Sequence, residues 1–264
     1  MQFLLHSLTH DNMGRNAVMQ KTFHKFDNDF MGREFYIWSY GHFGQPVLVF
    51  PSAAGMAHEW EAEGMIELLA PLIDTGKIKL YCPESNVAQT WNNKHTHPAD
   101  FIKSHQAYEH FVVNHLVPWI YSDCQTDYLP LVTTGVSMGG YYAVNHTLKY
   151  PHIFRGCFAM SGRYDIESFT HGFMNQDLYF NNPLAYLAQM DGEPLQNIQS
   201  LARFVLTCGK GAWEDGCLQE TIRLGEMLQH KQINAICDIW GEDSIHDWDW
   251  WKQHTMKHFG HILE

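Results

Sequence analysis

Basic residues are scarce in this chain, and long apolar runs are missing from it. The 17 lysines and arginines stand against 29 aspartates and glutamates, which gives a formal net charge of −12. Such a charge disfavours nucleic acid and anionic membranes as partners, because like charges repel at long range. No apolar stretch reaches the length of a membrane span. The N-terminal MQFLLHSLTHDNMGR lacks the basic leader, apolar run and cleavage site of a signal peptide, so we expect a cytoplasmic protein without an anchor.

Closely spaced cysteine pairs are absent as well. The six cysteines are Cys82, Cys124, Cys157, Cys208, Cys217 and Cys237. None of them belongs to a C-x-x-C pair, and four fall in or beside apolar runs of the kind that form strands. This pattern favours buried free thiols over disulfides or a zinc cluster, and it fits a reducing compartment.

Repeats, low-complexity tracts and linkers do not interrupt the sequence, and 45% of its residues are hydrophobic. A chain of 264 residues with this composition is long enough for one large domain, which we place at 1–264. Short apolar runs alternate with longer amphipathic runs, as strands alternate with crossover helices. We therefore predict an α/β fold of three layers, in which helices cover both faces of a mostly parallel central sheet.

One segment breaks this alternation. Residues 161–200 contain Gly172, an Asn-Asn-Pro sequence and many aromatic residues, so we predict an insertion over the edge of the sheet that acts as a cap or pocket wall. The predicted strands span 35–40, 47–50, 78–82, 129–134, 153–160, 202–208 and 235–240. The predicted helices span 61–74, 98–120, 139–149, 218–230 and 247–259.

The stretch TTGVSMGGYYAVN contains the pattern G-x-S-x-G at 135–139. In a nucleophile elbow this pattern joins a strand to a helix through a tight turn, and small residues stand where the two elements approach each other. Here the predicted strand 129–134 precedes the serine, a predicted helix follows it, and Gly140 gives further room. Ser137 is therefore the candidate nucleophile.

A serine nucleophile needs an adjacent base, which is itself oriented by a carboxylate. In sites of this type the chain order is serine, then acid, then histidine, and each partner lies on a loop after a later strand. Of the 18 histidines, His246 is the one that lies in a loop (241–246) between a predicted strand and a predicted helix. His246 is therefore the candidate base.

The candidate acid follows the predicted strand 202–208, in the sequence GKGAWEDGCLQE. Two adjacent acids are available there, and we expect one to turn toward His246 while the other begins the next helix. We prefer Glu214 for the first role, because aspartate is the better capping residue, and keep Asp215 as the alternative. Asp243 and Asp247 are expected to be loop and cap residues, since neighbours so close in sequence rarely reach the far nitrogen of a histidine.

An oxyanion hole needs two backbone N–H donors. The amide of Met138, directly after the nucleophile, is the first candidate. The second is expected from the loop PSAAG at 51–55, where small residues let the backbone approach a substrate oxygen. We expect the amide of Ala53 to serve, with Ser52 as the alternative.

The segments GVSMGG, CGKGAWED and SIHDWDWW together resemble the "Putative esterase" family of α/β-hydrolases. This family includes esterase D-type enzymes, feruloyl and acetyl-xylan esterases, enterochelin esterases and mycolyltransferases. The resemblance extends from Arg33 to the end of the chain, and it is closest to small bacterial members. It implies a serine esterase or acyltransferase without a cofactor, and a triad of Ser137, His246 and either Glu214 or Asp215. The loop PSAAG departs from the HG-type motif of many members, and no motif identifies the acyl group.

Three histidine patterns suggest a metal hydrolase instead, but each is incomplete. HTHPAD at 95–100 has its aspartate one position late for H-x-H-x-D-H, and HEW at 58–60 lacks the second histidine of H-E-x-x-H. His254 and His258 are spaced as i, i+4, yet no third ligand is evident. We interpret all of them as surface histidines and expect neither a metal nor a cofactor.

The sequence therefore predicts hydrolysis of a small-molecule carboxylic ester through a Ser-His-acid triad and an acyl-enzyme. An acyltransferase with the same triad and a non-catalytic binding module of the same fold are the alternatives. A homo-oligomer is left open. Four aromatic residues in predicted loops at the strand ends are equally suited to packing and to substrate binding, namely Trp91, Tyr164, Tyr179 and Trp213.

Overall fold

The computed structural model describes residues 19–26, 32–124 and 129–263. The N-terminal stretch that we expected to be neither a signal peptide nor an anchor lies outside these ranges. Within them, no helix combines the length and the apolarity needed to cross a bilayer.

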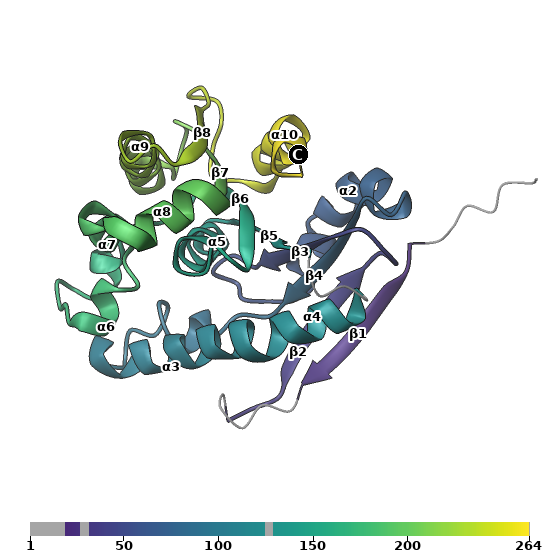
Figure 1. The fold of residues 1–264 in the computed structure, drawn as a ribbon, viewed down its shortest axis with the longest axis horizontal. Coiled ribbons are helices and arrows are strands. Elements are labelled where there is room, and N and C mark those ends of the chain that lie inside the picture. Colours follow the sequence, from purple (N-terminus) through teal and green to yellow (C-terminus); the bar gives the residue numbers. More distant parts are fainter. Residues whose placement is uncertain (1–18, 27–31, 125–128, 264) are drawn as a thin grey trace, which may run out of the picture.

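One sheet of eight strands, formed by the described residues, runs through the molecule in the order β1-β2-β4-β3-β5-β6-β7-β8 (Figure 1). β2 pairs antiparallel with both of its neighbours, whereas every pair from β4 to β8 is parallel. The mostly parallel sheet predicted from the sequence is thus confirmed. The strands are β1 (Lys21–Phe26), β2 (Phe35–Tyr40), β3 (Gln45–Phe50), β4 (Ile78–Pro83), β5 (Leu131–Val136), β6 (Phe154–Met160), β7 (Arg203–Cys208) and β8 (Asn234–Ile239).

Helices cover both faces of this sheet, so the predicted three layers are present. One apolar core joins the sheet to α1, α2 and α10, and a second joins it to α3, α4, α5 and α7–α9. Figure 1 shows α2 and α10 together on one side and α3 with α4 on the other. The helices are α1 (Glu59–Ala62), α2 (Met65–Asp74), α3 (Pro98–Phe111), α4 (Val117–Asp123), α5 (Met138–Lys149), α6 (Gln176–Tyr179), α7 (Pro183–Gln189), α8 (Gly192–Leu201), α9 (Asp215–His230) and α10 (Trp248–His258), with 3₁₀ turns at Val87–Gln89, Ile166–Phe169 and Phe259–Ile262.

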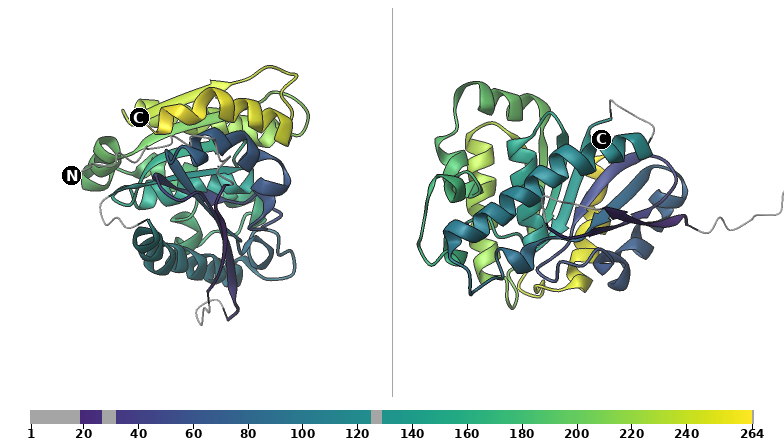
Figure 2. Two further views of the ribbon diagram at one scale, coloured as in Figure 1. Left: turned by 90° about the vertical axis from the view of Figure 1, so that its right-hand side faces the viewer. Right: turned by 90° about the horizontal axis from the view of Figure 1, so that it is seen from below.

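Two predicted helices differ from the observed ones in their continuity. The helix predicted at 98–120 runs from α3 through a π-helical turn (Val112–Leu116) into α4, and these form one rod in Figure 2. The helix predicted at 61–74 is divided, because Gly64 takes a left-handed φ of 76° between α1 and α2. A left-handed residue cannot continue a right-handed helix, so the chain turns there.

The two edge strands differ from the expectation in different ways. β1 was not predicted, because its alternating exposed residues include Lys21 and Lys25 and the strand contains no continuous apolar run. β8 was predicted as a buried strand but lies at the opposite edge, where Ile236 is 38% exposed. An edge strand has a neighbour on one side only, which leaves its residues less covered. Figure 2 shows β1 and β2 as a ribbon at their edge of the molecule.

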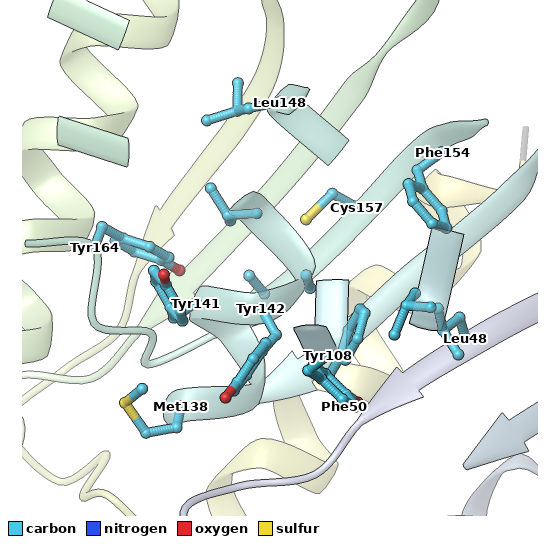
Figure 3. Packing of buried hydrophobic residues seen from close by; sticks show 14 of the residues in the cluster. Leu48, Phe50, Tyr108, Met138, Tyr141, Tyr142, Leu148, Phe154, Cys157 and Tyr164 are labelled. Carbon is cyan, nitrogen blue, oxygen red and sulfur yellow. The ribbon is translucent and has the colours of Figure 1, made fainter. Parts of the chain in front are cut away.

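The helix α5 packs against the sheet through large aromatic side chains. The ring of Tyr142 stacks on Phe50 of β3 at 5.7 Å between centroids and meets Tyr108 of α3 edge-on at 5.5 Å. Figure 3 shows these three rings together beneath α5, with Tyr141 on the neighbouring side of the helix. All four are fully buried. This packing fixes the helix that follows the predicted nucleophile.

The segment 161–200 contains α6, α7 and most of α8 and is hydrogen-bonded to the body of the domain. The side-chain oxygen of Asn181 accepts from Asn145 (3.0 Å) and Lys149 (3.1 Å) and lies 3.1 Å from His105 Nε2. Its backbone carbonyl accepts from the hydroxyl of Tyr141 (2.8 Å). These bonds tie the segment to α3 and α5. Its role as a cap or pocket wall stays a prediction.

Within the described ranges, three histidines are fully buried, namely His105 on α3, His146 on α5 and His254 on α10. Burial disfavours the charged imidazolium, so it lowers the pKa of His105 to about 3 and those of His146 and His254 to about 4, from the ordinary 6.5. Because the folded pKa lies below the unfolded one, the neutral rings stabilise the fold above pH 6.5. This contribution is lost as the pH falls toward 4.

We expect the free energy of unfolding to fall by about a few kcal/mol between pH 6.5 and pH 4. His254 contacts Thr207 Oγ1 (3.0 Å) and Ser244 Oγ (3.2 Å) through its two ring nitrogens. The variant His254→Gln offers an amide to the same partners but cannot be protonated, so its stability should depend less on pH in this window. His42→Gln, at an exposed position, is the control and should keep the wild-type slope. Urea unfolding at a series of pH values measures this, and equal slopes in all three proteins would contradict it.

Candidate active site

The predicted site residues gather at one edge of the sheet, where the parallel strands β3, β5, β7 and β8 have their carboxyl ends. Ser137 follows β5, Glu214 lies in the loop after β7, and His246 lies in the loop after β8. The loop 51–55 follows β3. In open α/β sheets, ligands bind outside this edge, so the arrangement is that of a site.

Ser137 occupies a strained turn between β5 and α5. Its φ of 54° and ψ of −121° lie outside the regions that a residue with a side chain prefers, which costs about 1–3 kcal/mol. A Cβ atom on Gly135 would overlap the backbone of Gly139, and one on Gly139 would overlap the carbonyl oxygens of Phe50 and Pro51. The pattern G-x-S-x-G is therefore required by close backbone contacts. It leaves Ser137 partly accessible at the first turn of the helix.

His246 and Glu214 meet directly. The Nδ1 atom of His246 lies 3.0 Å from Glu214 Oε2, and Glu214 is fully buried while His246 is partly exposed. Asp215, the alternative acid, is the exposed first residue of α9. Glu214 stands at the N-cap position without a capping bond, and Asp215 begins the helix, as expected of the acid that does not turn toward His246. The helix geometry sends the two adjacent side chains in different directions, and Glu214 turns inward.

Two residues that the sequence did not reveal support the Glu214 carboxylate, one directly and one through the other. The hydroxyl of Ser161 donates to Glu214 Oε1 (2.5 Å) and accepts from the indole N–H of Trp251 (3.0 Å). The ring of Trp251 also meets the ring of His246 edge-on at 4.8 Å. Ser161 follows β6 directly, and Trp251 belongs to the aromatic run after His246, so their positions at strand and helix ends were the available signals.

The loops that carry Glu214 and His246 are locked together by backbone contacts. The amide of Gly211 donates to Ser244 O (2.8 Å), and the amide of His246 donates to Ala212 O (3.1 Å). Any side chain at Gly209 or Gly211 would overlap the Ser244 carbonyl. Asp247, as predicted, is a cap residue, which accepts from the amide of Asp249 at the start of α10. The imidazole and the carboxylate are therefore fixed relative to each other.

The hydroxyl of Ser137 and the ring of His246 form no hydrogen bond in the part of the chain that the structure describes. Both residues are partly exposed and lie at the same edge of the sheet. In free enzymes the contact between nucleophile and base is often long, and it shortens only when substrate binds.

The amides of the loop 51–55 differ in whether they are hydrogen-bonded. The amide of Ser52 donates to Glu59 Oε2 (2.6 Å), that of Ala54 to Ser52 Oγ (3.2 Å) and that of Gly55 to Ser52 O (3.1 Å). The amide of Ala53 has no acceptor among the described residues. The amide of Met138 leads α5, where the first N–H groups have no acceptor within the helix. Ala53 therefore suits an oxyanion donor, whereas the amide of Ser52, the alternative, is occupied.

The four aromatic residues near the predicted site differ in exposure. Trp91 and Tyr164 are buried, at 4% and 0% exposure, and Tyr179 is half-buried. Trp213 is 86% exposed and adopts a left-handed φ of 69° directly before Glu214. Trp213 is thus the one of these four that is free to contact a substrate.

One group of potential metal donors lies among the described residues. Side-chain atoms of Glu214, Cys217 and His246 are within 4.8 Å of one another. Two of these residues, Glu214 and His246, already contact each other at 3.0 Å. The interpretation of His254 and His258 as surface residues was wrong. Both are buried, and His258 Nε2 lies 2.6 Å from Asp238.

The close contact at Gly139 gives a prediction about stability. Gly139→Ala would place a methyl group on the carbonyl oxygens of Phe50 and Pro51, and such overpacking typically costs about 1–3 kcal/mol. We expect the melting temperature to fall by roughly 2–10 °C. Gly260→Ala is the control, because no described atom lies within 4 Å of a Cβ at that position. Thermal unfolding of both variants tests this, and an unchanged melting temperature for Gly139→Ala would refute the close approach.

Comparison with solved structures shows how widely this architecture occurs. A ferulic acid esterase superposes with a TM-score of 0.73 at 15% identity, over 93% of this chain and 98% of its own. An S-formylglutathione hydrolase from Staphylococcus aureus gives 0.71 at 12% identity, over 94% and 100%. FphF, a fluorophosphonate-binding serine hydrolase of the same organism, gives 0.67 at 11% identity, over 93% and 99%. At such identities the likeness establishes the fold.

The sequence itself matches a family model over residues 80–261, which is more than half of the chain. No curated protein sequence matches it. The matched region includes the serine turn after β5 and both loops that carry Glu214 and His246. With its sheet order and its family match in agreement, the chain belongs to the "Putative esterase" family and has the α/β-hydrolase fold.

Proposed function

We propose that this protein hydrolyses a carboxylic ester through an acyl-enzyme intermediate, with Ser137 as nucleophile, His246 as base and Glu214 as the orienting acid. The observation that carries the proposal is the 3.0 Å contact of His246 Nδ1 with the buried Glu214 carboxylate, at the sheet edge where Ser137 occupies a strained turn. A carboxylate on Nδ1 fixes the tautomer whose Nε2 is free to accept a proton.

The reaction follows from these positions. His246 takes the hydroxyl proton as Ser137 attacks the ester carbonyl, and Glu214 stabilises the imidazolium that forms. His246 then protonates the leaving alcohol. Water attacks the acyl-enzyme in the second step, with His246 again acting as base. The role of Ser161 and Trp251 is to keep Glu214 and His246 in place, because Ser161 bonds the other carboxylate oxygen, and Trp251 donates to Ser161 and packs against the ring of His246.

The amides of Met138 and Ala53 are proposed as the oxyanion donors. Preorganised N–H groups stabilise the negative charge of the tetrahedral intermediate without reorganisation cost. The free amide of Ala53 supports this assignment, since its neighbours in the loop are already bonded.

A small-molecule ester is the proposed substrate. Among the structural neighbours, the names describe a ferulic acid esterase and an S-formylglutathione hydrolase, so the same fold serves both an aryl acid ester and a thioester. The exposed Trp213 beside Glu214 offers an apolar surface at the site. Transfer of the acyl group to an alcohol would use the same residues, with that alcohol in place of water. A binding module without catalysis would have no need of the strained Ser137 or the buried Glu214–His246 pair.

Replacement of the nucleophile gives the primary test. We expect Ser137→Ala to fold normally and to lose roughly three or more orders of magnitude in hydrolysis of p-nitrophenyl acetate and butyrate. It should also lose labelling by a fluorophosphonate. Ser122→Ala, which removes an exposed hydroxyl on α4, is the matched control and should behave as wild type. Retention of most activity by Ser137→Ala would exclude this mechanism, and absence of both activity and labelling in the wild type would favour a binding module.

The two adjacent acids give a second test. Because Glu214 contacts His246 and Asp215 is exposed at the start of α9, we expect Glu214→Ala to lower kcat by roughly three to four orders of magnitude. Asp215→Ala should change kcat by less than about threefold, since an exposed first-turn carboxylate contributes only a few tenths of a kcal/mol to its helix. Steady-state kinetics on the same ester decides between them. Similar losses in the two variants would remove Glu214 from the orienting role.

A further inference from the structure

A buried carboxylate outside the proposed triad lies under the loop 51–55. Glu59, the first residue of α1, is 5% exposed. It forms no salt bridge with any of the described residues. Burial raises the pKa of Glu59, and the hydrogen bonds from Ser52 oppose this rise. A carboxylate removed from water without a cation is expensive, so its hydrogen bonds must compensate for the lost hydration.

Those hydrogen bonds all come from one residue of the loop. The amide of Ser52 donates to Glu59 Oε2 (2.6 Å), and its hydroxyl donates to Oε1. The same hydroxyl oxygen accepts from the amide of Ala54 (3.2 Å). A carboxylate can accept two such bonds side by side, which fixes both the main chain and the side chain of Ser52.

The remaining contacts of the loop leave one amide free. The carbonyl of Ser52 accepts from Gly55, and the carbonyl of Ala53 accepts from the side chain of Asn92 (3.0 Å). At its other end the loop is pressed against the serine turn, since the Phe50 and Pro51 carbonyls contact Gly139. The backbone on both sides of the Ala53 amide is thus held by these contacts.

We propose that Glu59 is a positioning residue that orients the Ala53 amide for the developing oxyanion by clamping Ser52. This inference rests on the proposed esterase function. Glu59 touches no reacting atom, so it acts only through the loop. Such an effect is felt in the transition state, where charge resides on the oxyanion, and hardly at all in the ground state.

Three variants test the role. Glu59→Ala removes the acceptors, and Glu59→Gln offers an oxygen to the Ser52 amide and an N–H to its hydroxyl. Ser52→Ala keeps the bond from the Ser52 amide to Glu59 but removes the hydroxyl, with its bonds to Glu59 and to the Ala54 amide. Glu63→Ala, at an exposed position directly after α1, is the matched control. For each protein, kcat and KM are measured on p-nitrophenyl acetate, with concentration expressed as sites titrated by a fluorophosphonate. The inhibition constant of a trifluoromethyl ketone, which forms a tetrahedral adduct at the serine, is measured in parallel.

We expect Glu59→Ala to lower kcat per labelled site by roughly tenfold to several hundredfold, with little change in KM, because a misplaced donor costs less than the roughly hundred- to thousandfold found for outright loss of one. The inhibition constant of the ketone should rise by a similar factor. Glu59→Gln should recover most of the loss, Ser52→Ala should lose several-fold, and Glu63→Ala should match the wild type. A purely structural role would lower only the titrated fraction and the melting temperature.

The outcomes separate the two proposals. A wild type that neither hydrolyses the ester nor labels overturns the proposed function and the role of Glu59 with it. An active wild type with unchanged kcat per site and ketone affinity in Glu59→Ala overturns the role of Glu59 alone. If Glu59→Ala does not fold, Ser52→Ala decides, because unchanged kinetics in that variant would show that the clamp does not orient Ala53.

Discussion

The contact between two stretches of backbone at Gly139 is the constraint on which the rest of the site depends. The chain leaves β5, turns at Ser137 and enters α5. The turn is so tight that the backbone carbonyls of Phe50 and Pro51 lie against Gly139, where a side chain would not fit. This contact joins β3, β5 and α5 at one point. It presents the hydroxyl of Ser137 at a helix N-terminus, and it places the loop after β3 beside the amide of Met138. The strain of the turn is sustained because the aromatic packing beneath α5 holds the helix in position.

Two buried carboxylates then fix the groups on either side of that turn. Glu214 holds the imidazole of His246, and Glu59 holds the backbone of Ser52. Neither is bound to lysine or arginine among the described residues, so each is satisfied by hydrogen bonds from neutral groups. Hydrogen bonds to a carboxylate orient the donor group as well as stabilising it, because donors approach a carboxylate along defined directions. A site that must hold several groups within fractions of an ångström benefits from such partners more than from mobile surface ion pairs.

Features that depend on local sequence were predicted better than features that depend on contacts between residues far apart in the chain. The turn at Ser137 was predictable because its requirement is local, since glycine is needed on both sides of one serine. His246 was found by its place between a strand and a helix. The choice between Glu214 and Asp215 stayed open, because adjacent residues differ only in the direction that the start of a helix gives their side chains. Ser161 and Glu59 could not be found, since their partners lie 53 and 7 residues away in the chain and no local pattern marks the pairing.

Burial and exposure were predicted less well at the margins of the fold. Apolar runs identified the central strands. They did not reveal β1, which has alternating polar residues, and they did not show that β8 has a neighbouring strand on one side only. His254 and His258 were interpreted as surface histidines because no third metal ligand was evident, whereas α10 turns them toward Ser244 and Asp238. In each case the deciding factor is the position of the element in the sheet or against it, which a single sequence does not contain.

The buried histidines also change the net charge of the folded protein at mildly acidic pH. The sequence gives an isoelectric point of about 5.8, a value at which ordinary histidines are largely protonated. Among the histidines that the structure describes, His105, His146 and His254 remain neutral there because their pKa values are near 4 or below. A protonated Glu59 would offset at most one of the missing positive charges. The native protein should therefore still migrate as an anion at pH 5.8 and focus at a lower pH than its unfolded chain, which keeps native molecules mutually repulsive under mildly acidic conditions.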